Sequence, residues 1–146
     1  MTSRSTAISI ALTALGALPF YLILIAPSEV ARIIMVDPHS AYRSYGAVIG
    51  SFMAGTLWGF SQPASRTPIV AVVLSNILAL AVWSSLLIPL EAFRGWLWLQ
   101  LIVFWALLAI DWSLWRSGLE RDWYLRLRVL VTTAVSIAYL CAIFFW

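Results

Sequence analysis

The sequence predicts an all-α integral membrane protein, a single five-helix transmembrane bundle with its N-terminus in the cytoplasm and its C-terminus outside. The first observation is the composition: 63% of the 146 residues are hydrophobic and 10% are charged. Soluble domains contain about 45–50% apolar and about 25% charged residues. The second observation is that the charged residues leave long uncharged stretches, at 5–28, 44–65, 67–90, 95–110 and 129–146. This composition excludes an ordinary soluble domain, and also a disordered chain, which needs low hydrophobicity and high charge.

We expect the transmembrane helices to span about residues 7–27, 44–62, 68–89, 95–115 and 126–146. A helix that crosses a hydrocarbon core of about 30 Å needs roughly 20 mostly apolar residues. Three uncharged stretches are long enough by themselves, the fourth when it continues past Asp111, and the fifth when it includes Leu125 and Leu127. Because these spans leave only tails and short connections, residues 1–146 are predicted to form one domain. Membrane β-strands would instead alternate apolar and polar residues over about ten positions.

The first span follows Arg4 and contains the small residues Ala14 and Gly16, so a cleaved signal peptide is an alternative. Cleavage there would leave only a short apolar region before the cleavage site, and apolar sequence resumes at once with residues 18–23. The apolar region of a signal peptide has about 7–15 residues, so this one would barely reach the lower limit. We therefore expect an uncleaved first span.

The outer connection at residues 28–43 is predicted to hold two turns of helix lying on the membrane surface. Ser28 follows Pro27, and serine is a residue type that caps helix N-termini. Asp37 precedes Pro38, and a residue before proline disfavours the helical conformation. We therefore expect Ser28 to be the N-cap of this short helix, and the helix to end before Asp37.

Small residues recur at helical spacing along the second span. Gly46 and Gly50 form one pair, with Ser51 beside it, and Gly55 and Gly59 form another. At about 100° per residue, the two pairs lie on opposite faces of the helix. Small residues let helices approach closely in lipid, where van der Waals packing drives association. We expect intramolecular packing on both faces; the alternative is that one groove receives a membrane-protein partner or a second copy of the chain.

Asp111 is the one ionisable residue that must lie inside a span, about one turn from the span's cytoplasmic end. A carboxylate in hydrocarbon costs about 2.5–3.5 kcal/mol on insertion scales unless it is paired or solvated. Arg126 and Arg128 open the next span on the same membrane face. We predict an Asp111–Arg128 pair that ties the fourth and fifth spans together, with either a purely stabilising role or a role as a proton or substrate site.

Other polar or aromatic groups at membrane depth extend this candidate site. Gln100 lies on the same face of its helix as Asp111, and Asn76 lies midway along the third span. Such groups usually bond across helices. The full candidate ligand or polar site is Asp111, Arg128, Arg126, Trp58, Asn76 and Gln100.

The arginines predict the orientation. With five spans, one face carries six arginines, at positions 4, 66, 116, 121, 126 and 128, and the other carries three, at 32, 43 and 94. The positive-inside rule makes the six-arginine face cytoplasmic. The net charge of +3 then reflects topology and anionic headgroups, so the expected partner is the lipid bilayer and not a nucleic acid.

No motif for nucleotide binding, hydrolysis or dithiol redox chemistry occurs in the chain. His39 is the lone histidine and lacks other ligands at metal spacing, and Cys141 is the lone cysteine. We therefore expect no metal, no cofactor and no enzymatic activity.

Three features resemble the transmembrane protein 69-like family, whose bacterial members are catalogued as a domain of unknown function, number 3429. They are the glycine-rich stretch 45–59, the lone Asp111 late in the fourth span, and the segment from Trp123 to Arg128. Many members have a proline before the Trp-Tyr pair, where this chain has Asp122. The resemblance covers nearly the whole chain and implies a bacterial inner membrane or mitochondrial inner membrane location, without a reaction or ligand.

We therefore expect a small polytopic membrane protein without enzymatic activity, acting as an accessory to a larger complex or through helix packing. The alternative is a binding protein or carrier for a small apolar ligand, such as a quinone or a lipid, or for a proton, centred on Asp111 and Arg128.

Overall fold

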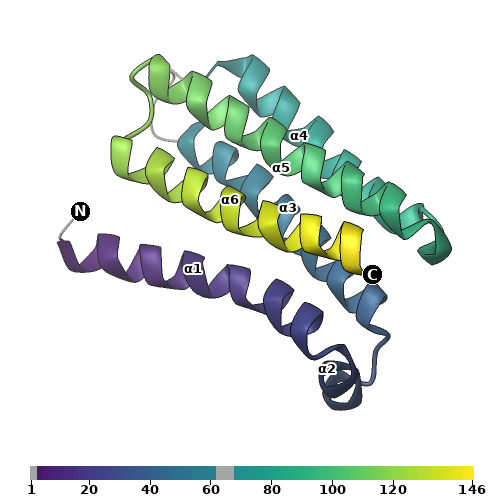
Figure 1. The fold of residues 1–146 in the computed structure, drawn as a ribbon. Coiled ribbons are helices and arrows are strands. Elements are labelled where there is room, and N and C mark those ends of the chain that lie inside the picture. Colours follow the sequence, from purple (N-terminus) through teal and green to yellow (C-terminus); the bar gives the residue numbers. More distant parts are fainter. Residues whose placement is uncertain (1–2, 62–67) are drawn as a thin grey trace.

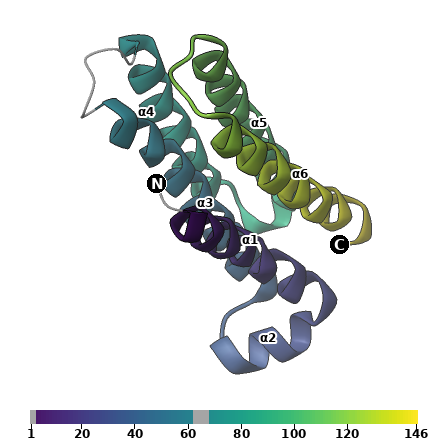
Figure 2. The same ribbon diagram turned by 90° about the vertical axis from the view of Figure 1, so that its left-hand side faces the viewer.

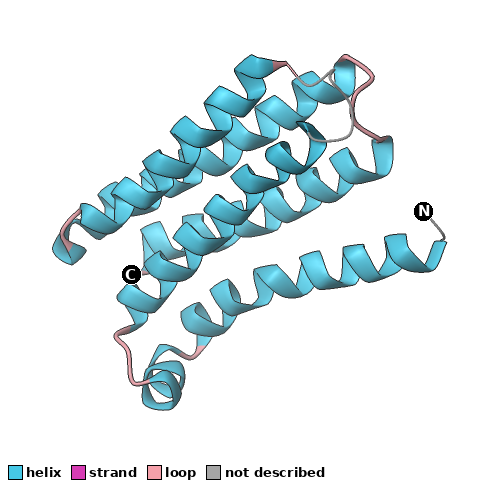
Figure 3. Ribbon diagram, turned by 180° about the vertical axis from the view of Figure 1, so that it is seen from behind, coloured by secondary structure: helices cyan, strands magenta, loops and turns pink. Residues whose placement is uncertain are grey.

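Helices make up most of the part of the chain that the structure, a computed structural model, describes. That part is residues 3–61 and 68–146, without the side chains at positions 3–7, 9, 59–61 and 93. The long helices are α1 (Ser3–Ile25), α3 (Pro38–Ser61), α4 (Ile69–Ser84), α5 (Phe93–Arg116) and α6 (Asp122–Phe145). A short α2 (Pro27–Ile34) joins α1 to α3, and two 3-10 turns, η1 (Ser85–Leu87) and η2 (Leu90–Ala92), join α4 to α5. Since the described residues contain no strand, the all-α class is confirmed (Figure 3).

The long helices run side by side in three layers (Figure 1). α1 packs against α3 and α6; α3 then packs on α4 and α5, while α6 packs on α5. Figure 2 shows α1 nearly end-on, with α2 turned away from the bundle. The start of α1 and the end of α6 lie at opposite ends of the bundle (Figure 1).

Three helical segments among the described residues are long and apolar enough to cross a membrane: Ile69–Leu87, Arg94–Arg116 and Asp122–Phe145. A fourth is added if Ile10–Ile25 and Pro27–Ile34, which meet at a bend of 109°, count as one broken span. α3 is rich in glycine, serine and tyrosine, which lower its average hydropathy. The structure thus supports a membrane protein with three to four candidate spans, and the predicted count of five stays a prediction.

The short helix after the first span is present, but the predicted N-cap, Ser28, is wrong. α2 begins at Pro27, with Ala26 as the capping residue and no side-chain cap. Proline suits the first position of a helix because its missing N–H would have no partner there and its φ is already helical. α2 ends at Ile34, before Asp37 as expected, and the C-cap residue Met35 has the left-handed conformation.

Aromatic rings from three helices fill the centre of the bundle. Phe20 of α1, Tyr42 of α3 and Tyr139 of α6 have no exposed surface. Their ring centroids are 5.2 Å (Phe20–Tyr42), 5.5 Å (Phe20–Tyr139) and 5.3 Å (Tyr42–Tyr139) apart, in edge-on or tilted arrangements. Such pairs prefer edge-to-face contact because of the ring quadrupole. This cluster fixes α1 against α3 and α6.

The first glycine pair of α3 is packed within the chain. A Cβ at Gly46 would overlap the Tyr139 hydroxyl and the Gln100 Oε1 atom. A Cβ at Gly50 would lie 2.9 Å from the Val82 Cγ2 atom, which is closer than carbon atoms approach. These glycines therefore let α4, α5 and α6 come close to α3.

In the second glycine pair, the structure describes the surroundings of Gly55, and Gly55 does not pack closely against another helix. A Cβ at Gly55 would meet nothing within 4 Å, and both Gly55 and Ser51 are exposed. The expectation that both faces are filled by this chain is thus wrong at Gly55, because no other helix among the described residues packs against it there. The surroundings of Gly59 lie outside the described residues.

Candidate functional site

Asp111 of α5 and Arg128 of α6 form a direct ion pair, in which Arg128 Nε donates to Asp111 Oδ2. The exposed fractions of the two side chains are 0% and 6%. The predicted pairing of these residues is therefore present, and it joins α5 to α6. Removing one partner of a buried pair typically costs about 3–5 kcal/mol, because it leaves an uncompensated charge.

Gly118 sets the turn between these two helices. Its φ is +72°, in the left-handed region that favours glycine. The Gly118 N–H donates to the Trp115 carbonyl (2.9 Å), and the Leu119 N–H donates to the Leu114 carbonyl (3.0 Å). These two bonds form a Schellman motif, which ends α5 and reverses the chain. The next residue, Glu120, is thereby folded back against the Asp111–Arg128 pair.

Glu120 is a member of this site that the sequence analysis missed. It is 8% exposed, and its carboxyl group interacts with both Asp111 and Arg128. Burial raises the pKa of Glu120 to about 8; repulsion from Asp111 acts in the same direction, whereas Arg128 opposes it. The sequence signal was Gly118, since a glycine just past a helix end indicates where the chain turns.

Several polar atoms of this cluster are buried without a hydrogen-bond partner in the described part of the chain. They are both carboxyl oxygens of Glu120, Asp111 Oδ1 and Arg128 Nη2; Thr132 Oγ1, one turn along α6 from Arg128, is also buried without a partner. Native structures pair the great majority of such atoms. The unmatched atoms therefore mark a polar site that a further proton or a ligand would complete. Among the described residues no group of three or more side chains could hold a metal ion.

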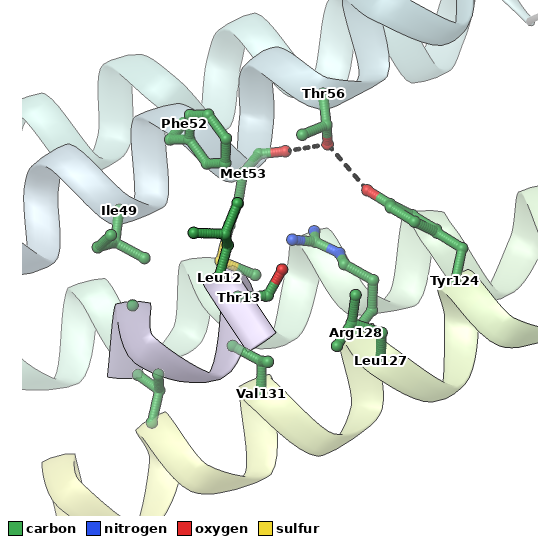
Figure 4. A pocket seen from close by; sticks show the side chains of 12 residues that line it. Leu12, Thr13, Ile49, Phe52, Met53, Thr56, Tyr124, Leu127, Arg128 and Val131 are labelled. Atoms are coloured by element: carbon green, nitrogen blue, oxygen red, sulfur yellow. Dashed lines mark hydrogen bonds between the residues drawn. The ribbon is translucent and has the colours of Figure 1, made fainter. Parts of the chain in front are cut away.

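An apolar cavity of about 250 Å³ lies between α1, α3 and α6, with Arg128 on its wall (Figure 4). Most of its lining is aliphatic or aromatic. The lining residues are Leu12, Thr13, Gly16, Ile49, Phe52, Met53, Thr56, Tyr124, Leu127, Arg128, Val131 and Val135. The cavity and the acidic cluster therefore share one residue, Arg128.

The polar groups of the cavity gather around Arg128. Figure 4 shows its guanidinium group pointing from α6 toward α3, with the Thr13 hydroxyl beside it. The Tyr124 hydroxyl donates to Thr56 Oγ1 (3.2 Å), and Thr56 Oγ1 donates to the Met53 carbonyl (2.7 Å). The cavity thus has one polar end and an apolar body, which is the usual division of a small-molecule site.

A family model described as "Protein of unknown function (DUF3429)" matches residues 5–144. The chain belongs to this family. The match confirms that part of the resemblance, while the link to the transmembrane protein 69-like group stays a prediction. Comparison with curated proteins and with solved structures found no match.

The position where many DUF3429 members were expected to carry proline is the first residue of α6. Asp122 occupies it here, and Arg121 precedes it in an extended conformation. Proline and acidic residues are both favourable at this point of a helix, proline through its fixed φ and an acid through the helix dipole. Asp122 Oδ1 also accepts a hydrogen bond from Trp115 Nε1 (2.6 Å), so it braces the turn that carries Glu120.

Gln100 belongs to a separate polar network. It lies eleven residues before Asp111, so the helical rise of 1.5 Å per residue separates the two by about 16 Å. Gln100 Nε2 donates to Ser85 Oγ (2.7 Å) and to the Arg43 carbonyl (3.0 Å), and the Tyr139 hydroxyl donates to Gln100 Oε1 (2.5 Å). This network connects η1, α3, α5 and α6, so we interpret Gln100 as a packing residue.

The other three members of the predicted site are exposed, whereas the ion pair is buried. Arg126 is exposed, because two residues along a helix rotate it about 200° from Arg128. Asn76 is exposed, and its Nδ2 donates to the Val72 carbonyl of its own helix (2.8 Å). Trp58 is 46% exposed on the outside of α3. Of the six predicted residues, the structure therefore brings together only Asp111 and Arg128.

Proposed function

We propose that this protein binds a small, neutral, largely apolar molecule in the cavity between α1, α3 and α6. The observation that carries the proposal is Arg128, a charged residue on the wall of a mostly apolar cavity, whose Nη2 is a buried donor without a hydrogen-bond partner among the described residues. Leaving such a donor unpaired costs about 1–3 kcal/mol. An oxygen of the bound molecule would supply the missing acceptor.

The charges around Arg128 favour a neutral ligand. Asp111 already offsets the charge of Arg128, and Glu120 adds a second acidic group to the same cluster. A carboxylate or phosphate on the ligand would stand near these acids, where a low dielectric strengthens repulsion. A carbonyl oxygen fits better, and both quinones and lipid esters carry one.

The size of the cavity favours a ring or a short stretch of chain. Its volume of about 250 Å³ is near the lower end of ligand pockets, which hold about 300–1,000 Å³. The lining residues Leu12 and Phe52 are 64% and 71% exposed, so one side of the cavity borders the apolar outer surface of the bundle. A tail attached to the bound ring would leave along this surface toward lipid.

The same proposal includes a five-span topology, with the N-terminus in the cytoplasm or mitochondrial matrix and the chain in an inner membrane. α1 and α3 have 23 and 24 residues, about 35 Å at 1.5 Å per residue, which exceeds the hydrocarbon thickness of about 30 Å. The start of α1 and the end of α6 lie at opposite ends of the bundle, which suits an odd number of spans (Figure 1). Arg128 is buried in its ion pair, so we leave it out of the arginine count. The positive-inside rule then compares five arginines on the proposed cytoplasmic face with three on the opposite face.

The test measures binding of a benzoquinone with a decyl tail to the purified protein in mild detergent. We expect saturable binding to the wild type and at least about tenfold weaker binding to Ile49→Trp, because the larger side chain takes up cavity volume. Val48→Trp is the matched control, since Val48 lies on the same helix, is 63% exposed and does not line the cavity. Equal affinity of wild type and Ile49→Trp, or tighter binding of decanoate than of the quinone, would contradict the proposal.

A non-enzymatic accessory role in a larger complex is the second candidate function. It is favoured by the open face of α3, where Ser51 and Gly55 are exposed one turn apart. Small residues at this spacing accept a partner helix at close range. Purification in mild detergent separates the candidates: a stoichiometric partner polypeptide favours the accessory role, and a bound quinone favours ligand binding.

A further inference from the structure

The cluster at the α5–α6 turn holds more acid than base. Asp111 and Glu120 supply two carboxyl groups, and Arg128 supplies one guanidinium. All three residues are at least nine-tenths buried. Arg128 already uses its Nε on Asp111, so one acid is balanced and the other is not.

The two acids also have fewer hydrogen-bond donors near them than carboxyl oxygens. Asp111 Oδ1 and both oxygens of Glu120 are buried without a donor among the described residues. An ionised carboxylate left in this condition is costly, because burial removes its water and nothing replaces it. When two carboxylates share a site, one of them keeps its proton.

We propose that Asp111 and Glu120 hold one exchangeable proton between them, beside Arg128, so that the α5–α6 turn is a proton-binding site. When the proton binds, an O–H bond forms on a carboxyl oxygen of the pair, and this group donates to the other acid. The proton comes from water at the end of the bundle where α5 and α6 connect, and it returns there when the pH rises. The cluster is electrically neutral with the proton and carries one negative charge without it.

The groups that face Glu120 determine whether its ionisation is favoured or disfavoured. Asp111 of α5 disfavours its ionisation, Arg128 of α6 favours it, and Tyr124 of α6 lies close by as a neutral phenol. Near the cluster, the described side chains of α1 and α3 contribute the hydroxyls of Thr13 and Thr56, which carry no charge. Burial remains the largest effect, and it raises the pKa of Glu120 to about 8 from 4.5.

The proton can reach the site without crossing the bundle. Glu120 lies in the connection between the ends of α5 and α6, and its neighbour Arg121 is exposed. A carboxyl group in this position exchanges with water at one membrane face only. This proposal does not depend on the quinone-binding proposal, since it needs no occupant of the cavity.

The experiment is an infrared pH titration of the purified protein in detergent. We expect the C=O band of a protonated carboxylic acid at about pH 6, its loss by about pH 10, and a midpoint near 8. Glu120→Gln removes the titrating band. Glu91→Gln is the matched control and leaves it, because Glu91 is an exposed acid of η2 at the other end of the bundle.

The same infrared titration of a second variant, Asp111→Asn, tests the role of the other acid. In Asp111→Asn the repulsion is gone and Arg128 is free to pair with Glu120, so the band disappears at a lower pH than in the wild type. The wild-type titration alone decides the question if either variant fails to fold. A wild-type spectrum without this band across the whole range, or a titrating band that persists in folded Glu120→Gln, overturns the proposal.

Discussion

Arg128 contacts both the acidic cluster and the cavity, and the shape of its side chain allows both contacts. Its Nε donates to Asp111, while the residue also lines the cavity and its Nη2 has no hydrogen-bond partner among the described residues. A guanidinium presents several donors in a fixed planar fork, whereas an ammonium is a single point charge. Arginine therefore joins the acidic cluster to the cavity in a way that lysine would not.

At Gly46 we predict that alanine destabilises the protein by about 1–3 kcal/mol, the usual cost of overpacking. The added methyl group would overlap the Tyr139 hydroxyl and Gln100 Oε1, so the hydrogen bond between them must break or α3 must move. Thermal unfolding in detergent, followed by the reaction of Cys141 with a thiol-reactive dye, measures the change. Gly55→Ala is the control with a change below about 0.5 kcal/mol, because its Cβ meets open space. Equal losses in the two variants would contradict this account.

The members of the site differ in how far the sequence could predict them. Asp111 and Arg128 could be paired because a charge inside an apolar stretch needs a partner, and helix spacing limits which partners reach it. Glu120 was harder to predict, because Gly118 indicates only that the chain turns there, while the burial of Glu120 depends on how the two helices meet at that turn. Asn76 failed as a site residue because its polarity is satisfied by its own helix, which sequence periodicity does not reveal.

At the scale of elements, the α5–α6 hairpin is the unit that creates the acidic cluster. The end of α5 is fixed by the left-handed Gly118, and the start of α6 is braced by the Trp115–Asp122 hydrogen bond. Without this short, defined turn, Glu120 would lie in water with an ordinary pKa. The turn therefore converts a surface acid into a buried one.

We predict that Gly118→Ala destabilises the protein by about 1–2 kcal/mol, the cost of placing a side chain in the left-handed region. If the turn shifts, the pKa of Glu120 falls from about 8 toward its ordinary value, and its infrared band is lost at lower pH. Gly118→Asn has a smaller effect, since asparagine tolerates this conformation. Gly95→Ala is the control, because its Cβ would meet only Ile88 Cγ2 at an ordinary 4.0 Å. An unchanged titration in Gly118→Ala would show that the turn does not position Glu120.

At the scale of the whole molecule, the positions of the charged residues predicted the order of the helices along the chain. They did not predict how the helices pack together. Each predicted span overlaps a long helix, because a helix satisfies the backbone hydrogen bonds of an apolar segment internally. The third was predicted to reach residue 89, but α4 ends at Ser84 and the 3-10 turn η1 follows it. The second begins at Pro38 and not near 44, because a helix continues past the apolar stretch when its polar turns pack on neighbours. Which helices touch depends on side-chain packing between distant segments, so the cavity between α1, α3 and α6 had no sequence signal.

The five-span topology makes a prediction about which surfaces water can reach. In a Cys141→Ala background, we expect Ser28→Cys of α2, which is exposed at the outer end, to react with a membrane-impermeant maleimide added outside intact cells. Val48→Cys is also exposed in the bundle, at 63%, but it would face hydrocarbon and stay unlabelled until the membrane is dissolved in denaturing detergent. If only three or four helices crossed the membrane and α3 did not, Val48→Cys would react in intact membranes on one side or the other. Reporters fused to the two chain ends complete the test: opposite sides require an odd number of spans, and a C-terminal reporter active only in the cytoplasm would contradict the proposed orientation.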